Sequence, residues 1–447
     1  MRLECLVPMY LLYSSLLAIG FLISIPYWAF QMLRHGKYGS GLGERLGRVA
    51  SRLMIQQSAS VIWVHAVSVG EVQAVTELIS GLRQKFPQHR VVISTTTATG
   101  QKLARSRFGE NNVFYFPLDF AFAIRPYLRL LRPELIVIAE TEFWPNFLRL
   151  TKASGAAISV VNARISDRSW RGYHRFRFLL RQFLQNIDLF LAQTNEDARR
   201  LQDIGAPAQR IQVSGNLKFD FALASPPPIV ASLRSAFLQS SAHPIIVCGS
   251  TVEDEEPLLL RAFENVLASY PKAVMILAPR HPERFEKIAE LLQHLGIRFW
   301  RRSLWNGDPV YGGVFLLDTI GELASTYALA DVAFVGGSLV PKGGHNIIEP
   351  AQHGVAIIVG NHTENFRDMV ELFRSRDAVR VAGPAEFPLL LMDLLSNDAE
   401  RQALGQRAAE TLRSQMGATQ RTLAALEGLL QPPRERPEMS RAGRGIV

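Results

Sequence analysis

The sequence predicts an α/β protein with two doubly wound domains in tandem, preceded by an apolar N-terminal helix. Strand-length apolar runs alternate with helical patterns, a proline-rich segment divides these runs into two series, and the chain opens with a long uncharged stretch. Near-continuous Val, Ile and Leu runs between amphipathic segments are typical of parallel strands that are buried on both faces. A chain of 447 residues is long enough for two such domains.

The stretch from Leu6 to Phe30 contains no charged residue. It is long enough to cross the ~30 Å hydrocarbon core of a bilayer, and Tyr27 and Trp28 stand where aromatic rings favour the membrane interface. Because a signal peptide has a shorter apolar core and a small-residue cleavage site, we expect a retained membrane anchor over residues 1–33. A helix that lies in the membrane plane is the alternative.

Basic residues are concentrated after this stretch, whereas Arg2 is the only basic side chain before it. The positive-inside rule therefore places the rest of the chain in the cytoplasm. The basic residues are Arg34, His35, Lys37, Arg45, Arg48 and Arg52.

Two series of apolar runs follow the anchor. The first comprises residues 61–67, 90–97, 112–119, 135–141, 156–164 and 189–194, and the second residues 244–250, 273–281, 313–319, 332–338 and 355–360. Three consecutive prolines in the segment 221–230 predict a hinge, because proline continues neither a helix nor a central strand. We expect domains over 34–222 and 223–430 and a disordered tail over 431–447.

The composition narrows the class of partner. A formal charge of +9 and a pI near 9.7 indicate an anionic partner, which nucleic acid, acidic lipid and a phosphorylated substrate all satisfy. The two cysteines, Cys5 and Cys248, are too few for a disulfide framework or a zinc site.

A strand-to-helix corner at His65–Glu71, with the sequence HAVSVGE, ends in a carboxylate. Ser68 and Glu71 have the S-x-x-E spacing of a capping box, in which Ser68 accepts from the backbone of Glu71 and Glu71 reaches back to the cap N–H. At a strand end that faces a substrate, the same carboxylate can take a proton from a nucleophilic hydroxyl. The residues alone leave both roles open.

Two further strand ends carry polar groups. Residues 94–100, STTTATG, predict an N-cap turn, with substrate binding as the alternative. Glu140 and Glu142 end the apolar run of residues 135–139, and burying such acids unpaired is costly. Paired acids at this position therefore favour a functional site.

Residues 162–183 interleave arginines with aromatic residues. Nucleic acid is one possible partner for such a segment, but the apolar N-terminus favours a membrane surface with phosphorylated lipid. A solvated basic helix is the simplest alternative. Lys218, in the segment GNLKFD, adds a positive charge near the end of the first domain.

The second series carries its polar residues on three loops. Arg280 follows a strand and is placed to meet a phosphate, and a helix is expected to start at Gly321–Glu322. The loop 336–354 is rich in glycine, which permits close approach of the backbone to a ligand. In it, Asn346 is expected to cap a helix that carries Glu349, an arrangement that suits a nucleotide phosphate and its ribose.

The sequence lacks the motifs of several enzyme classes, namely ATPases, dehydrogenases and metal-dependent sugar-nucleotide enzymes. No glycine-rich stretch has the Walker A pattern, and the glycines of residues 39–47 follow the anchor instead of a strand, so they are not a dinucleotide fingerprint. No Asp-x-Asp pair is present to hold a metal ion against a diphosphate. The sequence therefore favours chemistry without a metal or other cofactor, on a single phosphate.

Seven ordered segments together resemble the 3-deoxy-D-manno-octulosonic acid (Kdo) transferases of lipopolysaccharide synthesis. They are HAVSVGE, AETEFWPN, NARISDRS, GNLKFD, APRHPERF, DTIGEL and FVGGSLVPKGGHNIIEPA. The resemblance runs from the anchor to about residue 425. It implies a GT-B architecture, with two Rossmann-like domains facing a cleft, at the cytoplasmic side of the inner membrane.

The resemblance also implies substrates and roles. The N-terminal domain would bind a lipid A precursor (lipid IVA) and the C-terminal domain CMP-Kdo, with no nucleic-acid partner. Glu71 would be the general base, and Glu140 and Lys218 would stabilise the transition state of an inverting transfer to a glucosamine hydroxyl. The donor contacts would be Pro279, Arg280, Ile320, Gly321, Glu322, Asn346, Ile347, Ile348 and Glu349. Asn216 stands where family members have Ser, and IIEP replaces a Pro-Leu-Glu type sequence.

Two other functions fit parts of the sequence. A membrane-associated transferase with a UDP-sugar donor would use the same architecture, because one fold serves many donors. A non-catalytic adaptor would bind lipid phosphates through Arg164–Arg181 and would not need Glu71.

Overall fold

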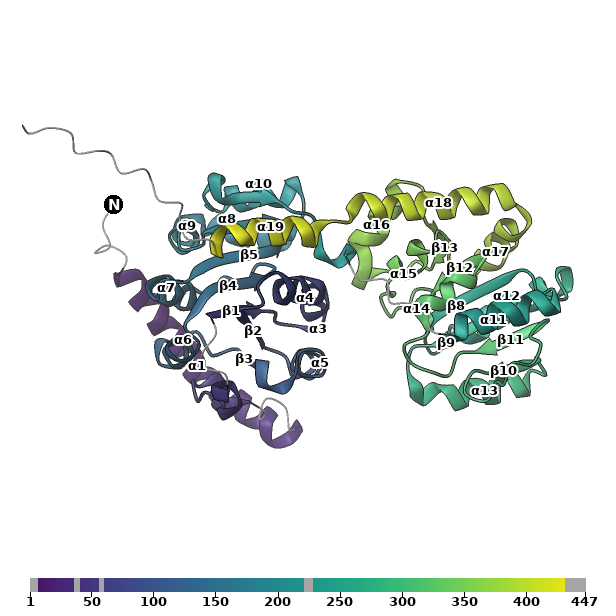
Figure 1. Cartoon of the computed structure of the whole chain (residues 1–447), viewed down its shortest axis with the longest axis horizontal. Helices are drawn as coiled ribbons and strands as arrows, with labels where there is room; N and C mark the ends of the chain where they lie inside the picture. The colour runs from purple at the N-terminus through teal and green to yellow at the C-terminus, as the bar shows by residue number, and fades with distance from the viewer. Residues whose placement is uncertain (1–6, 36–40, 56–59, 221–227, 431–447) are drawn as a thin grey trace, which may run out of the picture. The chain divides into compact units, whose positions relative to one another are not determined.

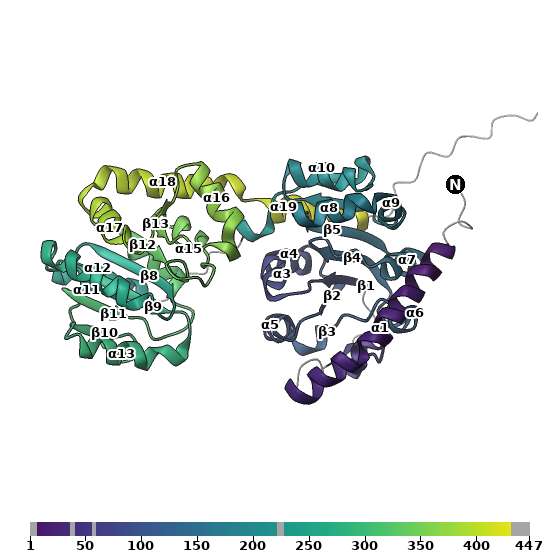
Figure 2. The same ribbon diagram turned by 180° about the vertical axis from the view of Figure 1, so that it is seen from behind.

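The computed structural model describes residues 7–35, 41–55, 60–220 and 228–430, which form two compact units. The first unit comprises residues 1–222 and 416–447, and the second residues 223–415. Each unit has a central sheet between layers of helices (Figures 1 and 2). Two α/β units with parallel sheets confirm the predicted fold class.

The sheet of the first unit has seven parallel strands in the order β3-β2-β1-β4-β5-β6-β7. The strands are β1 (Ser60–His65), β2 (His89–Thr95), β3 (Val113–Tyr115), β4 (Pro133–Ala139), β5 (Ala157–Ala163), β6 (Leu189–Ala192) and β7 (Ile211–Val213). The helices are α2 (Leu42–Arg45), α3 (Val69–Ala74), α4 (Thr76–Lys85), α5 (Ala98–Phe108), α6 (Ala121–Leu131), α7 (Pro145–Ala153), α8 (Asp167–Arg175), α9 (Arg177–Leu184) and α10 (Asn195–Asp203).

Alternate residues of the central strands fill two separate cores, because successive strand side chains point to opposite faces. Trp63 of β1 packs in the core that contains Tyr127 of α6 and Phe147 of α7. Its neighbours in the strand, Ile62 and Val64, pack in the other core, with residues of α3 and α4. Burial on both faces explains why these strands read as uninterrupted apolar runs.

The N-terminal helix α1 (Val7–His35) packs along the first unit beside α6 and α7 (Figures 1 and 2). Tyr10 is buried in the core beside Phe183, and Phe21 makes an edge-to-face contact with Phe120. The window Met9–Pro26 is apolar and long enough to cross a membrane. The predicted apolar helix is therefore present, and one side of it is packed against protein.

The second sheet also has seven parallel strands, in the order β10-β11-β9-β8-β12-β13-β14. The strands are β8 (Ile245–Thr251), β9 (Val274–Pro279), β10 (Phe299–Arg301), β11 (Gly313–Leu316), β12 (Val332–Val335), β13 (Ala356–Val359) and β14 (Arg380–Val381). The helices are α11 (Pro228–Ser240), α12 (Glu256–Ser269), α13 (Phe285–His294), α14 (Leu323–Thr326), α15 (Ile348–Gln352), α16 (Arg367–Ser375), α17 (Phe387–Ser396) and α18 (Asp398–Gln415).

The last helix, α19 (Ala418–Leu430), departs from the expected domain division. The sequence placed residues up to 430 in the C-terminal domain, but Leu423 and Leu426 are buried in a core of the first unit. Asp220 caps this helix, because its carboxylate accepts from the N–H groups of Gly417 (2.7 Å) and Thr419. Most of the expected hinge, and the expected disordered tail at 431–447, lie outside the described residues.

Each sheet reverses its strand order beside its first strand. In the first unit the reversal falls between β1 and β4, and in the second between β8 and β12. At such a switch point the loops at the carboxyl ends of neighbouring strands diverge and leave room for a ligand. The loops after β1, β4, β8 and β12 are therefore the first places to look for a site.

Candidate active site

The switch point of the first sheet is lined by acids. Glu71 lies in the first turn of α3, directly after β1, and Glu140 and Glu142 follow β4. Because β1 and β4 pair in register, with His65 opposite Ile138, their carboxyl ends lie at the same edge of the sheet. The structure thus brings the predicted base and the paired acids to one place.

Glu71 is buried, with 8% of its surface exposed, and both carboxylate oxygens accept hydrogen bonds. The Val67 N–H donates to Oε2 (2.8 Å) and the Ser68 hydroxyl donates to Oε1 (2.9 Å). Ser68 accepts from the Glu71 N–H (3.4 Å), as the capping-box spacing predicts. The return bond differs from the prediction, because Glu71 reaches the N–H of Val67 and the side chain of Ser68 instead of the cap N–H.

Burial raises the pKa of Glu71 from 4.5 to about 7. The hydrogen bonds from Val67 and Ser68 lower it, whereas the nearby negative charges of Glu140 and Glu142 raise it further. A carboxylate of this kind is a better proton acceptor near neutral pH than an exposed glutamate, because general-base efficiency is greatest when the pKa lies close to the working pH.

Glu140 is held in an unusual backbone conformation and paired with a lysine. Its φ of +58° lies in the left-handed region, which a residue other than glycine occupies at a cost of about 1–3 kcal/mol. The Lys218 Nζ donates to its Oε1 (3.2 Å). Strain of this kind persists where the surroundings hold it and is common at functional sites. The predicted residues Glu140 and Lys218 are therefore neighbours.

The turn that carries Lys218 is fixed from inside the sheet by Asn162. The Leu217 N–H donates to Asn162 Oδ1 (2.9 Å), and Asn162 lies at the end of β5 with a φ of +54°. The predictions from sequence assigned no role to Asn162. An asparagine at the end of an apolar strand is the signal for it, because asparagine tolerates the left-handed conformation.

The hydroxyl-rich corner at 94–100 is an N-cap turn, as its sequence predicts. Thr97 caps α5 by accepting from the Gly100 N–H (3.1 Å), and its hydroxyl donates to the Val67 carbonyl (3.2 Å). A Cβ on Gly100 would lie 3.2 Å from the Ser68 backbone carbon, so glycine permits α5 to approach the Glu71 corner closely.

In the second unit, Arg280 lies among residues of the loop 336–354. Burial, the larger cause, and the positive charge of Arg280 together lower the pKa of His345 to about 4. Burial raises the pKa of Glu349, whereas the charge of Arg280 lowers it. The Arg280 N–H donates to the carbonyl of Thr251 at the end of β8 (2.8 Å). Arg280 itself is exposed and available to a ligand.

Asn346 forms a turn just before α15. Its Oδ1 accepts from the Ile348 N–H (3.1 Å) and its Nδ2 donates to Glu349 Oε1 (3.5 Å). The helix begins at Ile348 with Ile347 as the N-cap residue, so Asn346, which was predicted to be the cap, lies one residue before it. Ile347 and Ile348 are buried and anchor this turn in the domain.

In the predicted loop after β11, the Glu322 side chain is bonded to other residues of the protein. Glu322 is paired with Arg302 through two hydrogen bonds of 3.0 Å and accepts from the Thr319 hydroxyl. Ile320 is 80% exposed and Gly321 has a φ of +92°. The Glu322 carboxylate thus already has a protein partner, while the backbone of Ile320 and Gly321 lies at the surface.

Two buried acids that the sequence analysis missed hold these loops. Glu255 is fully buried and accepts from the N–H groups of Gly337, Ser338 and Leu339 (2.7–2.8 Å), directly after β12. Glu256, also fully buried, pairs with Arg284 (3.0 Å) in the segment after β9. Only the paired acids at the start of a helix signal them in sequence.

A family model described as 3-deoxy-D-manno-octulosonic-acid transferase (kdotransferase) matches residues 40–221. The 3-deoxy-D-manno-octulosonic acid transferase of Haemophilus influenzae is 33% identical over 425 residues, which cover 94% of this chain and 98% of the relative. That of Bordetella pertussis is 37% identical over 403 residues, 86% of this chain and 91% of the relative. The chain belongs to the Kdo transferase family.

This Kdo transferase is a glycosyltransferase of lipopolysaccharide biosynthesis with a GT-B fold. A glycosyltransferase from Rickettsia africae is 15% identical with a TM-score of 0.51 and covers 84% of this chain and 100% of its own. A crystal structure of the C-terminal CMP-Kdo binding domain of WaaA from Acinetobacter baumannii is 33% identical, covers 42% of this chain and 98% of its own, and has a TM-score of 0.39.

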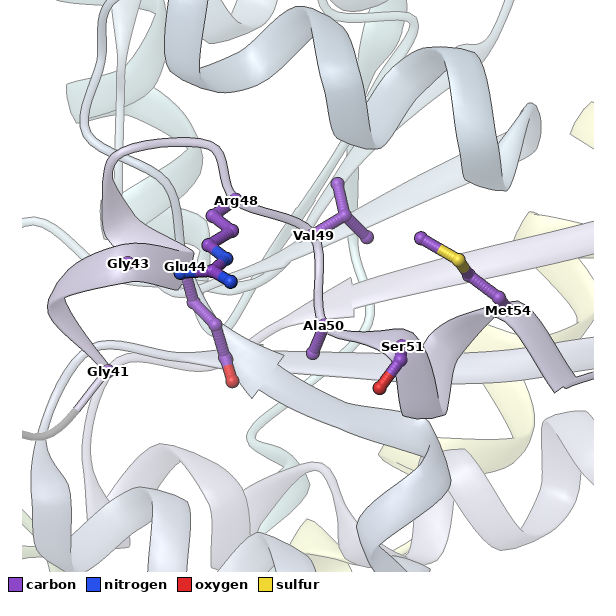
Figure 3. Close-up of a pocket in the computed structure, with 8 residues that line it drawn as sticks. All are labelled: Gly41, Gly43, Glu44, Arg48, Val49, Ala50, Ser51 and Met54. Atoms are coloured by element: carbon purple, nitrogen blue, oxygen red, sulfur yellow. The ribbon is translucent and has the colours of Figure 1, made fainter.

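A hollow of about 470 Å³ on the Kdo transferase lies outside this acidic site. Figure 3 shows the Glu44 and Arg48 side chains there, on α2 and the segment after it. Glu44 is held by Arg52 (2.5 Å) and by the N–H of Tyr115 in the edge strand β3 (2.8 Å). The lining residues are Gly41, Gly43, Glu44, Arg48, Val49, Ala50, Ser51 and Met54.

Within residues 7–35, 41–55, 60–220 and 228–430, no group of three or more His, Cys, Asp or Glu forms a metal site.

Proposed function

We propose that this Kdo transferase moves Kdo from CMP-Kdo to a glucosamine hydroxyl of a lipid A precursor, with inversion at the anomeric carbon and Glu71 as general base. The observation that supports this proposal most strongly is the buried Glu71 carboxylate at the β1–β4 switch point, with its pKa raised to about 7. A purely capping role would require only the hydrogen bonds of Glu71, and neither a raised pKa nor neighbouring acids. The raised pKa and the adjacent acids fit proton transfer.

The proposed step balances as follows. The acceptor hydroxyl oxygen forms a bond to the anomeric carbon of Kdo while the bond from that carbon to the phosphate oxygen of CMP breaks. The hydroxyl proton passes to Glu71, and CMP leaves with the bonding electron pair. Positive charge develops on the sugar as the donor bond breaks, and the carboxylate of Glu140, held 3.2 Å from Lys218, is proposed to stabilise it.

The donor is proposed to bind at the carboxyl ends of the second sheet. Arg280 supplies a positive charge for the single phosphate of CMP, and Glu349 supplies a carboxylate beside it for the ribose hydroxyls. The full set of proposed contacts is Pro279, Arg280, Ile320, Gly321, Glu322, Asn346, Ile347, Ile348 and Glu349. The Glu322–Arg302 pair favours a backbone contact at Ile320–Gly321 over a contact through the Glu322 side chain.

The protein is proposed to work at the cytoplasmic side of the inner membrane. On α1, Leu12, Leu16, Ile19 and Ile23 recur at helical spacing and are 53–74% exposed. Phe178, between arginines of α9, is 77% exposed. Tyr10 contacts Phe183 and Phe21 contacts Phe120 of the domain. These contacts favour a helix held at the bilayer surface over one that crosses it alone.

Mass spectrometry of lipid IVA incubated with CMP-Kdo and the protein tests the proposal. We expect products heavier by whole Kdo units, with release of CMP, and no product when lipid IVA is replaced by a lipid without glucosamine. A thermal shift comparison separates the donor classes, since CMP is expected to raise the melting temperature more than UDP. Stabilisation by UDP alone, without Kdo transfer, would support the UDP-sugar alternative and contradict the proposal.

A further inference from the structure

The acidic loop after β4 ends in a helix that takes its cap from elsewhere in the chain. The N-cap residue of α7, Trp144, makes no side-chain cap bond in the described structure. The buried Asp119, which precedes α6, accepts instead from the N–H groups of Asn146 (3.0 Å) and Phe147 (2.7 Å). A carboxylate at this point also interacts favourably with the positive end of the helix dipole.

The N-terminal helix reaches the same cap. The Tyr13 hydroxyl donates to Asp119 Oδ2 (2.9 Å), and Asn146 Nδ2 donates to the Ser14 Oγ (3.0 Å) and to the Asp119 carbonyl (2.7 Å). Two adjacent residues of α1 therefore bond to both members of the Asp119–Asn146 pair. Asn146 is in the first turn of α7, and this helix begins directly after the loop that carries Glu140 and Glu142.

Another tyrosine of α1 provides an internal comparison. The Tyr10 hydroxyl accepts from Asn186 Nδ2 (3.1 Å) and its ring packs against Phe183, at the end of α9. Tyr10 also contacts α7 through Arg149, whose guanidinium lies 4.9 Å from the centre of the ring, but its hydroxyl bonds to Asn186 and not to the Asp119–Asn146 pair. If the polar contacts of α1 served only to satisfy buried groups, the hydroxyls of Tyr10 and Tyr13 would matter equally.

We propose that Asp119 is a positioning residue that joins α1 to the acidic loop, so that docking of α1 through Tyr13 and Ser14 sets the geometry of Glu140 and Glu142. The N-terminal helix is then part of the acceptor site as well as a membrane contact. This inference rests on the proposed function of the acidic residues. Its consequence is that loss of one hydroxyl on α1 slows transfer even where membrane attachment is not needed.

The test compares Tyr13→Phe with Tyr10→Phe in the full chain, with CMP-Kdo and lipid IVA in detergent micelles. Each change removes one hydroxyl from the same helix and keeps the aromatic ring. We expect kcat to fall about tenfold for Tyr13→Phe, because small displacements of reacting groups are costly. The KM for CMP-Kdo should not change, and Tyr10→Phe should stay within about twofold of wild type.

A pH profile separates positioning from loss of folding. Burial raises the pKa of Asp119 to about 6, while Tyr13 of α1, the N–H groups of α7 and Arg149 of α7 lower it. Without Tyr13 the carboxylate protonates at higher pH, so the loss in kcat should be greater at pH 6 than at pH 8. The melting temperatures of Tyr13→Phe and Tyr10→Phe show whether either variant is unfolded. Ser14→Ala removes the contact with Asn146 and leaves Tyr13 in place, and its kcat is measured in the same way.

Wild-type kcat in both Tyr13→Phe and Ser14→Ala would overturn the inference while leaving the proposed function intact, because wild type would still transfer Kdo. Equal losses of kcat in Tyr13→Phe and Tyr10→Phe would also overturn it, since docking of α1 as a whole would then be responsible. Absence of Kdo transfer by the wild-type chain would instead contradict the proposed function.

Discussion

Glu71 belongs to the capping turn of α3 and is proposed to be the general base, two roles that local sequence cannot separate. The S-x-x-E spacing correctly predicts that Ser68 caps α3. The raised pKa depends on burial and on Glu140 and Glu142, which a different strand brings to the same sheet edge. Both acids are visible in the sequence as polar residues after an apolar run. Their proximity to Glu71 follows only from the pairing of β1 with β4.

The donor proposal depends on the charge of Arg280. For Arg280→Ala we expect CMP to bind roughly 10- to 100-fold more weakly, because a hydrogen bond to a charged group contributes about 1.5–3 kcal/mol. Isothermal titration calorimetry with CMP measures this change. Arg261→Ala removes an exposed arginine of α12 in the same unit and should leave CMP affinity unchanged. Equal affinities of the two variants would remove Arg280 from the donor site.

The central strands and the edge strand β3 were predictable, whereas the edge strands β7, β10 and β14 were not. Strands such as β1, β4 and β8 are buried on both faces and therefore appear as continuous apolar runs. The edge strands β7 and β14 are short, and their residues are at least partly exposed, so no apolar run marks them. Their pairing is set by the neighbouring strand.

The sequence also could not predict on which unit α19 packs. Its apolar residues predict a buried face but not the sheet that covers it. The contacts that decide are Asp220 at its N-terminus and the Arg421 Nε, which donates to the Ser214 carbonyl (2.8 Å). Both partners belong to the end of the first unit, so the helix packs there.

Asp220→Ala is expected to destabilise the first unit by about 0.5–2 kcal/mol, the usual cost of removing an N-cap. The physical reason is that the N–H groups of Gly417 and Thr419 lose their acceptor. Thermal unfolding followed by circular dichroism measures the effect. Asp393→Ala, an exposed acid on α17, serves as the control and should unfold like wild type. An unchanged melting temperature for Asp220→Ala would show that the cap contributes nothing.

The N-terminal helix has two distinct faces. Tyr10, Tyr13 and Ser14 pack or bond to the first unit, whereas Leu16 and Ile19 are more than half exposed. The length and apolarity of the helix predicted an anchor. The contacts with the domain depend on tertiary packing, which explains why the sequence left the choice between spanning and lying in the plane open.

Replacing Leu16 and Ile19 together by Glu should weaken binding of the full chain to anionic vesicles by at least about tenfold, because two apolar side chains lose their place in the bilayer. Sedimentation with vesicles of phosphatidylethanolamine and phosphatidylglycerol measures the bound fraction. Leu238→Glu with Leu389→Glu makes the same charge change at exposed leucines of the second unit. Similar losses in both double variants would mean that charge alone, and not the face of α1, controls binding.

In the proposed reaction the carboxylate of Glu71 takes the acceptor proton. Burial raises its pKa from 4.5 to about 7, so its charged form costs stability above pH 4.5 and the full cost is present above pH 7. In Glu71→Gln the amide oxygen still accepts from the Val67 N–H and the charge is gone. The variant should therefore melt at the same or a higher temperature than wild type at pH 8.

The most direct test is the rate of Kdo transfer from CMP-Kdo to lipid IVA by Glu71→Gln and wild type between pH 5.5 and 8.5. We predict that the wild-type rate rises with pH through about 7, as Glu71 loses its proton. The variant should lack this rise and be roughly 10²–10⁴-fold slower at pH 8, with unchanged CMP affinity and undiminished thermal stability. A variant that transfers Kdo at the wild-type rate, or whose lost activity follows a lowered melting temperature, would contradict the role of Glu71 as general base.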